Sequence, residues 1–169
     1  HRITGRPGDV LQLHDQDDVA ARLGSENADV LMTEVVTAAR HIAWASDEAW
    51  FAVRRQLTSS VFRRSGRRRD LGNGIALQDG SVELESTSKV DELTAIRVAA
   101  AAATNWARIG RSTLDRLTSA PPLPEPWPRE ARDRFIELLR SGQPAVGVIE
   151  TLDLNDLWLP LVPEWEPNR

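Results

Sequence analysis

The chain has 169 residues, of which 41% are hydrophobic and 27% charged, and its formal net charge at pH 7 is −4. This composition is typical of one folded globular domain, and the acidic balance argues against broad nucleic-acid binding. Cysteine is absent and no run of 18 apolar residues occurs, which excludes disulfides, thiolate metal sites and a hydrophobic membrane-spanning helix from this sequence.

The first elements predicted are a short helix and then a long one. Asp9 is placed to cap the short helix, and Gly24 is placed to end it. Between Asn27 and Leu57 there is no proline or glycine, and apolar residues recur at steps of three and four. This stripe consists of Leu31, Val35, Ala38, Ile42, Ala45, Ala49 and Val53. A helix this long buries such a stripe only against other helices, so we expect it to form the core, with Ile42 inside.

Residues 59–88 are predicted to form a basic loop followed by one β-hairpin. The basic patch of the chain lies in this loop and consists of Arg63, Arg64, Arg67, Arg68 and Arg69. It is interpreted either as a solvated loop or as a docking site for an acidic partner. Apolar residues then alternate on either side of Asp79-Gly80, a two-residue hairpin signal. Gly72-Asn73-Gly74 lacks the lysine and hydroxyl of a phosphate loop and is predicted to be a turn.

Four further helices are predicted in the second half of the chain. The first begins at Asp91 and runs to about Trp106, and its alanine run favours close approach of another helix. A short helix follows, with Ser112 and Asp115 as a capping box. After a proline-rich connection, the last two helices are expected over residues 129–141 and from Pro144 onward.

Histidine and carboxylate groups offer little for catalysis. His14-Asp15 has the dipeptide of metal-dependent phosphohydrolases, but such a site needs more ligands than His1 and His41 supply. The acidic residues near His41 in the sequence are Glu34, Asp47 and Glu48. This group is interpreted as a surface or interface cluster on the long helix. We therefore predict no catalytic, cofactor-binding or metal-binding residue in this chain.

The tryptophans are expected to anchor the core, because each buries a large apolar area. They stand at positions 44, 50, 106, 127, 158 and 165. Trp165 is the expected exception, since it lies near the end of the sequence among charged residues and is expected to pack against a further domain. The fold class predicted from these patterns is mainly α: a helical bundle built on one long helix, with a single β-hairpin insertion.

Several short motifs occur in an order that is more specific than any one of them. They are Gly5-Arg6, Asp9, Gln16, Val19-Ala20, Leu23-Gly24, Asp79-Gly80 with Val82, Leu114, Leu117, Pro126-Trp127-Pro128, Ala131-Arg132, Leu138-Leu139, Leu152-Asp153 to Leu161, and Pro163-Glu164-Trp165. Together they resemble the helical middle region of the bifunctional uridylyltransferase/uridylyl-removing enzymes that modify the PII nitrogen-signalling protein. The resemblance covers residues 1–166, and residues 167–169 are expected to be a tail leading to a missing domain.

The resemblance implies a larger cytoplasmic enzyme. Such enzymes have a nucleotidyltransferase domain before this region, and an HD hydrolase domain and two glutamine-sensing ACT domains after it. The parent would use Mg²⁺ and UTP, or ATP, to modify PII, while this segment would hold the catalytic domains in register and carry no cofactor itself. No motif of either catalytic domain occurs here, so no catalytic residue is carried over. The alternative is a non-enzymatic helical adaptor that docks an acidic partner through Arg63–Arg69.

Overall fold

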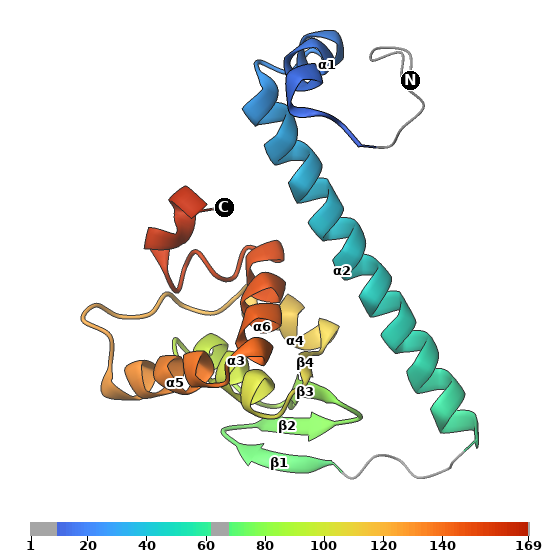
Figure 1. The fold of residues 1–169 in the computed structure, drawn as a ribbon. Helices are drawn as coiled ribbons and strands as arrows, with labels where there is room; N and C mark the ends of the chain where they lie inside the picture. Colours follow the sequence, from blue (N-terminus) through green and yellow to red (C-terminus); the bar gives the residue numbers. More distant parts are fainter. Residues whose placement is uncertain (1–9, 62–67, 169) are drawn as a thin grey trace. The chain divides into compact units, whose positions relative to one another are not determined.

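The computed structural model describes residues 10–61 and 68–168, and the chain divides into two compact units. We call residues 1–51 the N-terminal unit and residues 52–169 the C-terminal unit. Figure 1 labels the helices and strands along the chain. They are the 3₁₀ turn Leu13–Asp15, α1 (Gln16–Leu23), α2 (Ala28–Val61), β1 (Arg69–Gly72), β2 (Ile75–Gln78), β3 (Ser81–Leu84), α3 (Thr94–Thr104), β4 (Arg108–Ile109), α4 (Arg111–Leu117), α5 (Arg129–Arg140), α6 (Gln143–Leu154) and the 3₁₀ turns Pro163–Asn168.

The N-terminal unit contains α1 and the first two-thirds of α2. Gly24 ends α1 in the left-handed conformation, with φ +80°, as a residue without Cβ can at little cost. Asn27 then caps α2, because its side-chain oxygen accepts a hydrogen bond of 2.9 Å from the Val30 N–H. The expected cap at Asp9 lies outside the described residues.

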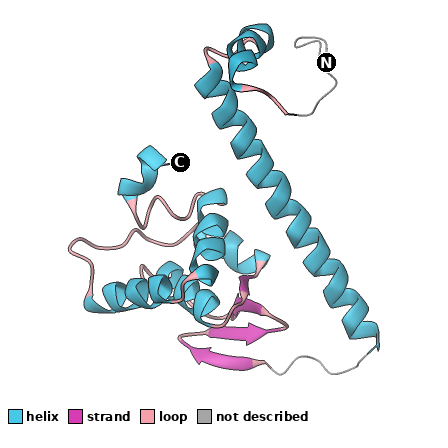
Figure 2. Cartoon of the chain, in the orientation of Figure 1, coloured by secondary structure: helices cyan, strands magenta, loops and turns pink. Residues whose placement is uncertain are grey.

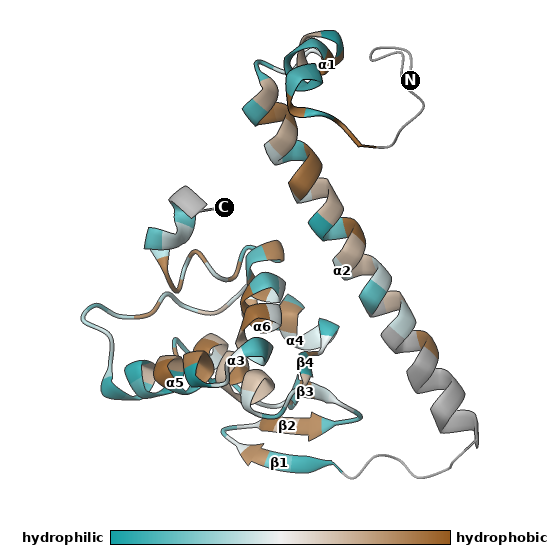
Figure 3. Cartoon of the chain, in the orientation of Figure 1, coloured by the Kyte–Doolittle hydropathy of each residue, from teal (hydrophilic) through white to brown (hydrophobic). Residues whose placement is uncertain are grey.

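The prediction that the stripe of α2 forms the core is wrong for the residues that the structure describes. Leu31 is buried, but Val35 is exposed and the Ile42 side chain is 70% exposed. Figure 3 shows hydrophobic and hydrophilic residues interspersed along this helix. The spacing of the apolar residues defines one face of the helix but does not specify what covers that face. The expectation that Ile42 is a core residue is therefore wrong as well.

The expected single hairpin is instead part of a four-stranded mixed sheet with the order β1-β2-β3-β4, which corrects the predicted fold class (Figure 2). The β1-β2 and β2-β3 pairs are antiparallel, whereas β4 pairs in parallel with β3 after the chain has passed through α3. The chain therefore remains mainly helical, but the expected hairpin belongs to a sheet against which α3, α4 and α6 pack.

Two tight turns build the antiparallel part of this sheet. Asn73 and Gly74 connect β1 to β2, and Asp79 and Gly80 connect β2 to β3. All four residues have positive φ, between +50° and +77°. This is the type I′ geometry, whose twist matches that of the flanking strands. The Asp79-Gly80 hairpin is thus present as predicted, while the strand before Asn73 was missed.

The core of the C-terminal unit forms around α3. This helix packs against α5 and α6 and also against β3 and β4. Its alanines at positions 99, 100, 102 and 103 are almost fully buried, so the neighbouring helices come close to its backbone. The largest fully buried apolar side chains here are Trp158, Ile96, Leu114, Leu117, Leu138, Leu152, Val82 and Val98.

Aromatic rings extend this core toward the end of the chain. Trp127 meets Phe135 edge to face at a centroid distance of 5.3 Å, and Phe135 stacks on Trp158 at 6.2 Å. Trp165 in turn meets Trp158 edge to face at 6.3 Å. Trp165, which was expected to pack against a further domain, thus has a ring contact within this chain, and its packing against a further domain stays a prediction.

Two other tryptophans depart from the prediction that all but Trp165 anchor the core. Trp50 on α2 is 60% exposed, and Trp106, just after α3, is 78% exposed. The composition of a segment indicates that a tryptophan tends to be covered, but only the fold decides which one is.

Candidate functional site

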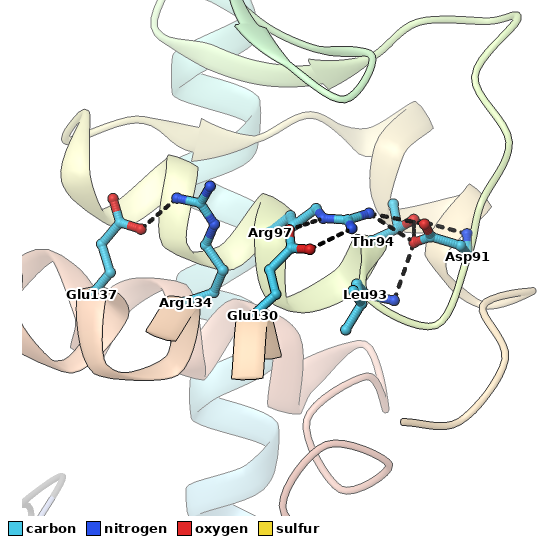
Figure 4. A network of polar contacts seen from close by, with 7 residues as sticks. All are labelled: Asp91, Leu93, Thr94, Arg97, Glu130, Arg134 and Glu137. Carbon is cyan, nitrogen blue, oxygen red and sulfur yellow. Dashed lines mark hydrogen bonds and ion pairs between the residues drawn. The ribbon is translucent and has the colours of Figure 1, made fainter. Parts of the chain in front are cut away.

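Arg97 lies at the centre of a polar network between α3 and α5 (Figure 4). Its Nε donates to Glu130 Oε1 at 2.6 Å and its Nη2 donates to Glu130 Oε2 at 3.0 Å. On the other side, its Nη1 donates to both carboxylate oxygens of Asp91, at 2.8 and 3.1 Å. The Arg97 side chain is only 15% exposed, so the guanidinium bridges two carboxylates at the edge of the core.

Asp91 is itself fixed by the turn that leads into α3. Its Oδ1 accepts hydrogen bonds from the Thr94 hydroxyl at 2.6 Å and from the Leu93 N–H at 3.1 Å. The Asp91 N–H in turn donates to Thr94 Oγ1 at 2.8 Å. This reciprocal pair resembles a capping box. Asp91 thus acts at the entry to the helix as expected, although α3 itself begins at Thr94.

The network shifts the pKa values of its members in consistent directions. The hydrogen bond from Arg97 lowers the pKa of Glu130 below its ordinary value of 4.5. Partial burial raises the pKa of Asp91, but the hydrogen bonds from Thr94 and Arg97 outweigh it and lower the pKa below 3.8. The bond to Glu130 is the largest cause of a raised pKa at Arg97. All three groups are therefore charged at neutral pH.

The chemistry of this network is that of a cross-link. Asp91 accepts hydrogen bonds from the guanidinium and from the groups at the entry to α3, Glu130 accepts from the guanidinium, and Arg97 donates to both carboxylates. A cavity of about 170 Å³ adjoins Arg97, with Arg134 and Glu137 on its wall. That pair is also engaged, through a 2.7 Å bond between Arg134 and Glu137 (Figure 4). The arrangement holds α3 to α5.

Replacing Arg97 with methionine is expected to lower the free energy of unfolding at pH 7 by about 2 kcal/mol, because it leaves two carboxylates facing each other across a half-buried site. Both carboxylates have a lowered pKa in the folded state, so their contribution is complete above their ordinary values of 3.8 and 4.5 and is lost as pH falls through the lowered ones. The variant should therefore lose less stability than the wild type between pH 7 and pH 3. Urea unfolding followed by circular dichroism measures both effects.

Arg132→Met is the matched control for this experiment. Arg132 lies exposed on α5 and, in the part of the chain that the structure describes, has no ion-pair partner. Its replacement should leave stability within about 0.5 kcal/mol of the wild type. Equal acid sensitivity of Arg97→Met and the wild type would show that Arg97 does not hold the two carboxylates in their charged form.

A second polar cluster positions α4 against the sheet. The Glu83 carboxylate on β3 accepts hydrogen bonds of 3.1 Å from both the Ser112 and Thr113 hydroxyls. Thr113 Oγ1 also accepts from the Leu84 N–H at 2.9 Å. A Cβ at Gly110 would collide with the Glu83 carboxylate, so a larger residue there would push this flexible side chain away from its present position. The predicted capping box of Ser112 and Asp115 does not form, because Ser112 bonds to Glu83 instead.

The histidines and arginines singled out in the sequence do not converge on one place. His14 lies on the surface with its Nε2 3.6 Å from Asp15 Oδ2, and His41 is exposed on α2. Arg68 pairs with Glu85, and Arg69 donates to the Asn105 side chain. The rest of the basic patch, Arg63, Arg64 and Arg67, lies outside the described residues.

Metal-ligating side chains do not gather in the part of the chain that the structure describes. Within residues 10–61 and 68–168, His, Asp and Glu residues form no group of three or more that could hold a metal ion. Over the same ranges, no helix combines the length and the apolarity needed to cross a membrane.

The Arg97 network was not predicted, because nothing local in the sequence marks it. Arg97 and Glu130 are 33 positions apart and belong to different helices. The one available signal was the Asp91–Thr94 spacing of a capping box, which indicates the helix entry but not the arginine that joins it.

Comparison with known proteins gives consistent relatives. Over its full length the chain is 40% identical to the "Bifunctional uridylyltransferase/uridylyl-removing enzyme" of Streptomyces coelicolor and 37% identical to that of Mycobacterium tuberculosis. Over 98% of its length it is 36% identical to the enzyme of the same name from Corynebacterium glutamicum. The chain spans 22%, 22% and 24% of the length of these three proteins. No protein-family model and no solved structure matches it.

Proposed function

We propose that residues 1–166 form a helical middle domain that positions the catalytic domains of a bifunctional uridylyltransferase/uridylyl-removing enzyme. Over its full length, the chain is a homologue of one segment of that enzyme family. The observation that carries this proposal is identity of 36–40% along at least 98% of the chain to three enzymes of one name, each more than four times as long. In this proposal the chain contributes geometry, and the flanking domains contribute the chemistry.

The proposed parent enzyme transfers UMP, or AMP, from the nucleoside triphosphate to the PII signal protein with Mg²⁺, and removes it again in response to glutamine. A nucleotidyltransferase domain would precede this segment, and an HD domain and two ACT domains would follow it, in the cytoplasm. For the segment to hold catalytic domains in register, each of its two units must move as a rigid body between docking arrangements.

Rigidity of the C-terminal unit supports this role. The cross-link from Arg97 to Glu130 joins α3 to α5, and the Glu83 carboxylate joins β3 to α4. Most of α2 belongs to the N-terminal unit, where it adds a second rigid element: its 34 residues form one continuous helix of about 51 Å at 1.5 Å per residue. Both features are suited to transmitting position, because hydrogen-bonded cross-links and a continuous helix resist bending.

A segment exchange tests the proposal. Residues 1–169 replace the matching segment of the Streptomyces coelicolor enzyme, and nucleotide transfer to a PII protein and its removal are measured. Both activities should persist in this chimera, whereas a flexible glycine-serine linker in the same place should lower the transfer rate by roughly a hundredfold, because the catalytic groups lose their relative orientation. Residues 1–169 alone should transfer no nucleotide. Full activity with the linker, or turnover by the isolated chain, would contradict the proposal.

The adaptor alternative depends on Arg63–Arg69, and no observation favours it. The two described arginines of that patch are engaged within the chain, by Glu85 and Asn105. The relatives at 36–40% identity all carry the name of an enzyme.

A further inference from the structure

A groove of about 560 Å³ lies on the C-terminal unit, between the end of α3 and one side of α5. Trp106 and Ile136 give it an apolar part, and Asp133, Glu137 and Arg140 give it a charged part. All of its lining residues belong to the C-terminal unit. Tryptophan and arginine beside an aliphatic side chain are typical of the central residues of protein interfaces.

Trp106 occupies a backbone position that usually favours glycine. It follows α3 with φ +51°, its N–H donates to the Ala103 carbonyl at 3.2 Å, and the Ala107 N–H donates to the Ala102 carbonyl at 2.9 Å. This is the Schellman motif, whose left-handed residue is usually glycine. The indole is also 78% exposed. Neither the backbone nor the core of this chain explains a tryptophan here, so its indole is available to an outside partner.

The charges of the groove specify what that partner should carry. The Asp133 carboxylate lies 3.7 Å from Arg129, and the Glu137 carboxylate lies 2.7 Å from Arg134, so both acids are already paired on their own helix. Arg140 is exposed and has no ion-pair partner among the residues described. The unmatched charge is thus positive, and a complementary partner brings a carboxylate to it.

We propose that this groove binds an acidic segment of the same, longer polypeptide, with an apolar side chain against Trp106 and Ile136 and a carboxylate on Arg140. This inference rests on the proposed function. A parent as long as the relatives would have more than three-quarters of its polypeptide outside this chain. Attachment within one polypeptide gives such a segment a high effective concentration, which allows a shallow groove to be occupied stably.

Hydroxyl-radical footprinting read by mass spectrometry tests the occupant. The rate of oxidation of the Trp106 indole is compared between the isolated chain and the full-length parent. It should fall about tenfold in the parent, as the exposed fraction drops from 78% to that of a covered side chain. In the full-length parent, Arg140→Gln should raise the rate about fivefold, because the carboxylate loses its partner, whereas Arg140→Lys should restore most of the protection.

Arg132→Gln is the matched control, because Arg132 lies on the same helix and does not line the groove. Trp106→Gly separates docking from folding. Glycine suits this backbone, so the isolated variant should remain as stable as the wild type, while amide hydrogen exchange over residues 133–141 of the full-length parent should increase several-fold.

Equal oxidation of Trp106 in the isolated chain and the full-length parent would overturn the proposal. Protection that grows with the concentration of the isolated chain would overturn it in favour of a second copy, and protection that requires added PII protein would overturn it in favour of the substrate. The segment exchange measures catalytic activity and tests the proposed function, whereas the footprinting measures how far one indole is covered and tests the groove. Failure of either proposal is therefore distinguishable from failure of the other.

Discussion

Replacing Trp158 with alanine is expected to lower the free energy of unfolding of the C-terminal unit by about 4 kcal/mol, because it empties the centre of the aromatic cluster. The side chain is 2% exposed and contacts two other rings, Phe135 from α5 and Trp165 from the last turn of the chain. Alanine leaves a cavity that both neighbours line, and a rigid core closes only part of such a cavity. Urea unfolding followed by circular dichroism measures the loss.

Trp106→Ala is the matched control for this substitution, because it removes the same side chain from an exposed position. It should change the stability of the isolated chain by less than about 1 kcal/mol. If Trp158→Ala were no more destabilising than Trp106→Ala, the aromatic cluster would not be part of the core, and the closing segment of the chain would be held by something else.

Replacing Ala102 with leucine is expected to cost about 3 kcal/mol by overpacking. Ala102 is fully buried in α3, the helix against which both α5 and α6 pack, so the added atoms have no space without moving a neighbouring helix. Helix propensity alone would predict almost no change, since leucine and alanine are both good helix formers. Thermal and urea unfolding, with near-ultraviolet circular dichroism to report tertiary packing, measure the result.

Ala101→Leu provides the comparison on the same helix. Ala101 is only half-buried and borders the 170 Å³ cavity beside Arg97, so the larger side chain has somewhere to go. Its cost should stay below about 1 kcal/mol. Equal losses of stability at both positions would mean that leucine is costly anywhere in α3, and not only on the face that packs against α5 and α6.

Local chemistry made several parts of this fold predictable. Gly24 and Asp79-Gly80 have the positive φ values that their turns require, and both were identified from residue type alone. The end of α5 and the start of α6 also follow from sequence, through Gly142 and the proline after it. In each case the residue type that predicts the turn or helix end lies within a few positions of the backbone that it shapes.

The features that the sequence does not predict depend on contacts between residues that are far apart along the chain. β4 is two residues long and has no alternation of its own, so only its pairing with β3 identifies it. The exposure of Ile42 and the contact of Trp165 with Trp158 were likewise decided by neighbours that periodicity does not specify. The same holds for the candidate site, since Arg97 meets Glu130 only once α3 and α5 are packed.

The parallel pairing of β3 with β4 has a consequence for the order in which this unit folds. β1, β2 and β3 are joined by two-residue turns, so their closure requires little loop entropy and is fast. β4 joins the sheet only after a crossover of more than twenty residues that includes α3. Completion of the sheet therefore waits on docking of the helix, and the rate of folding is governed by this non-local step rather than by the hairpins.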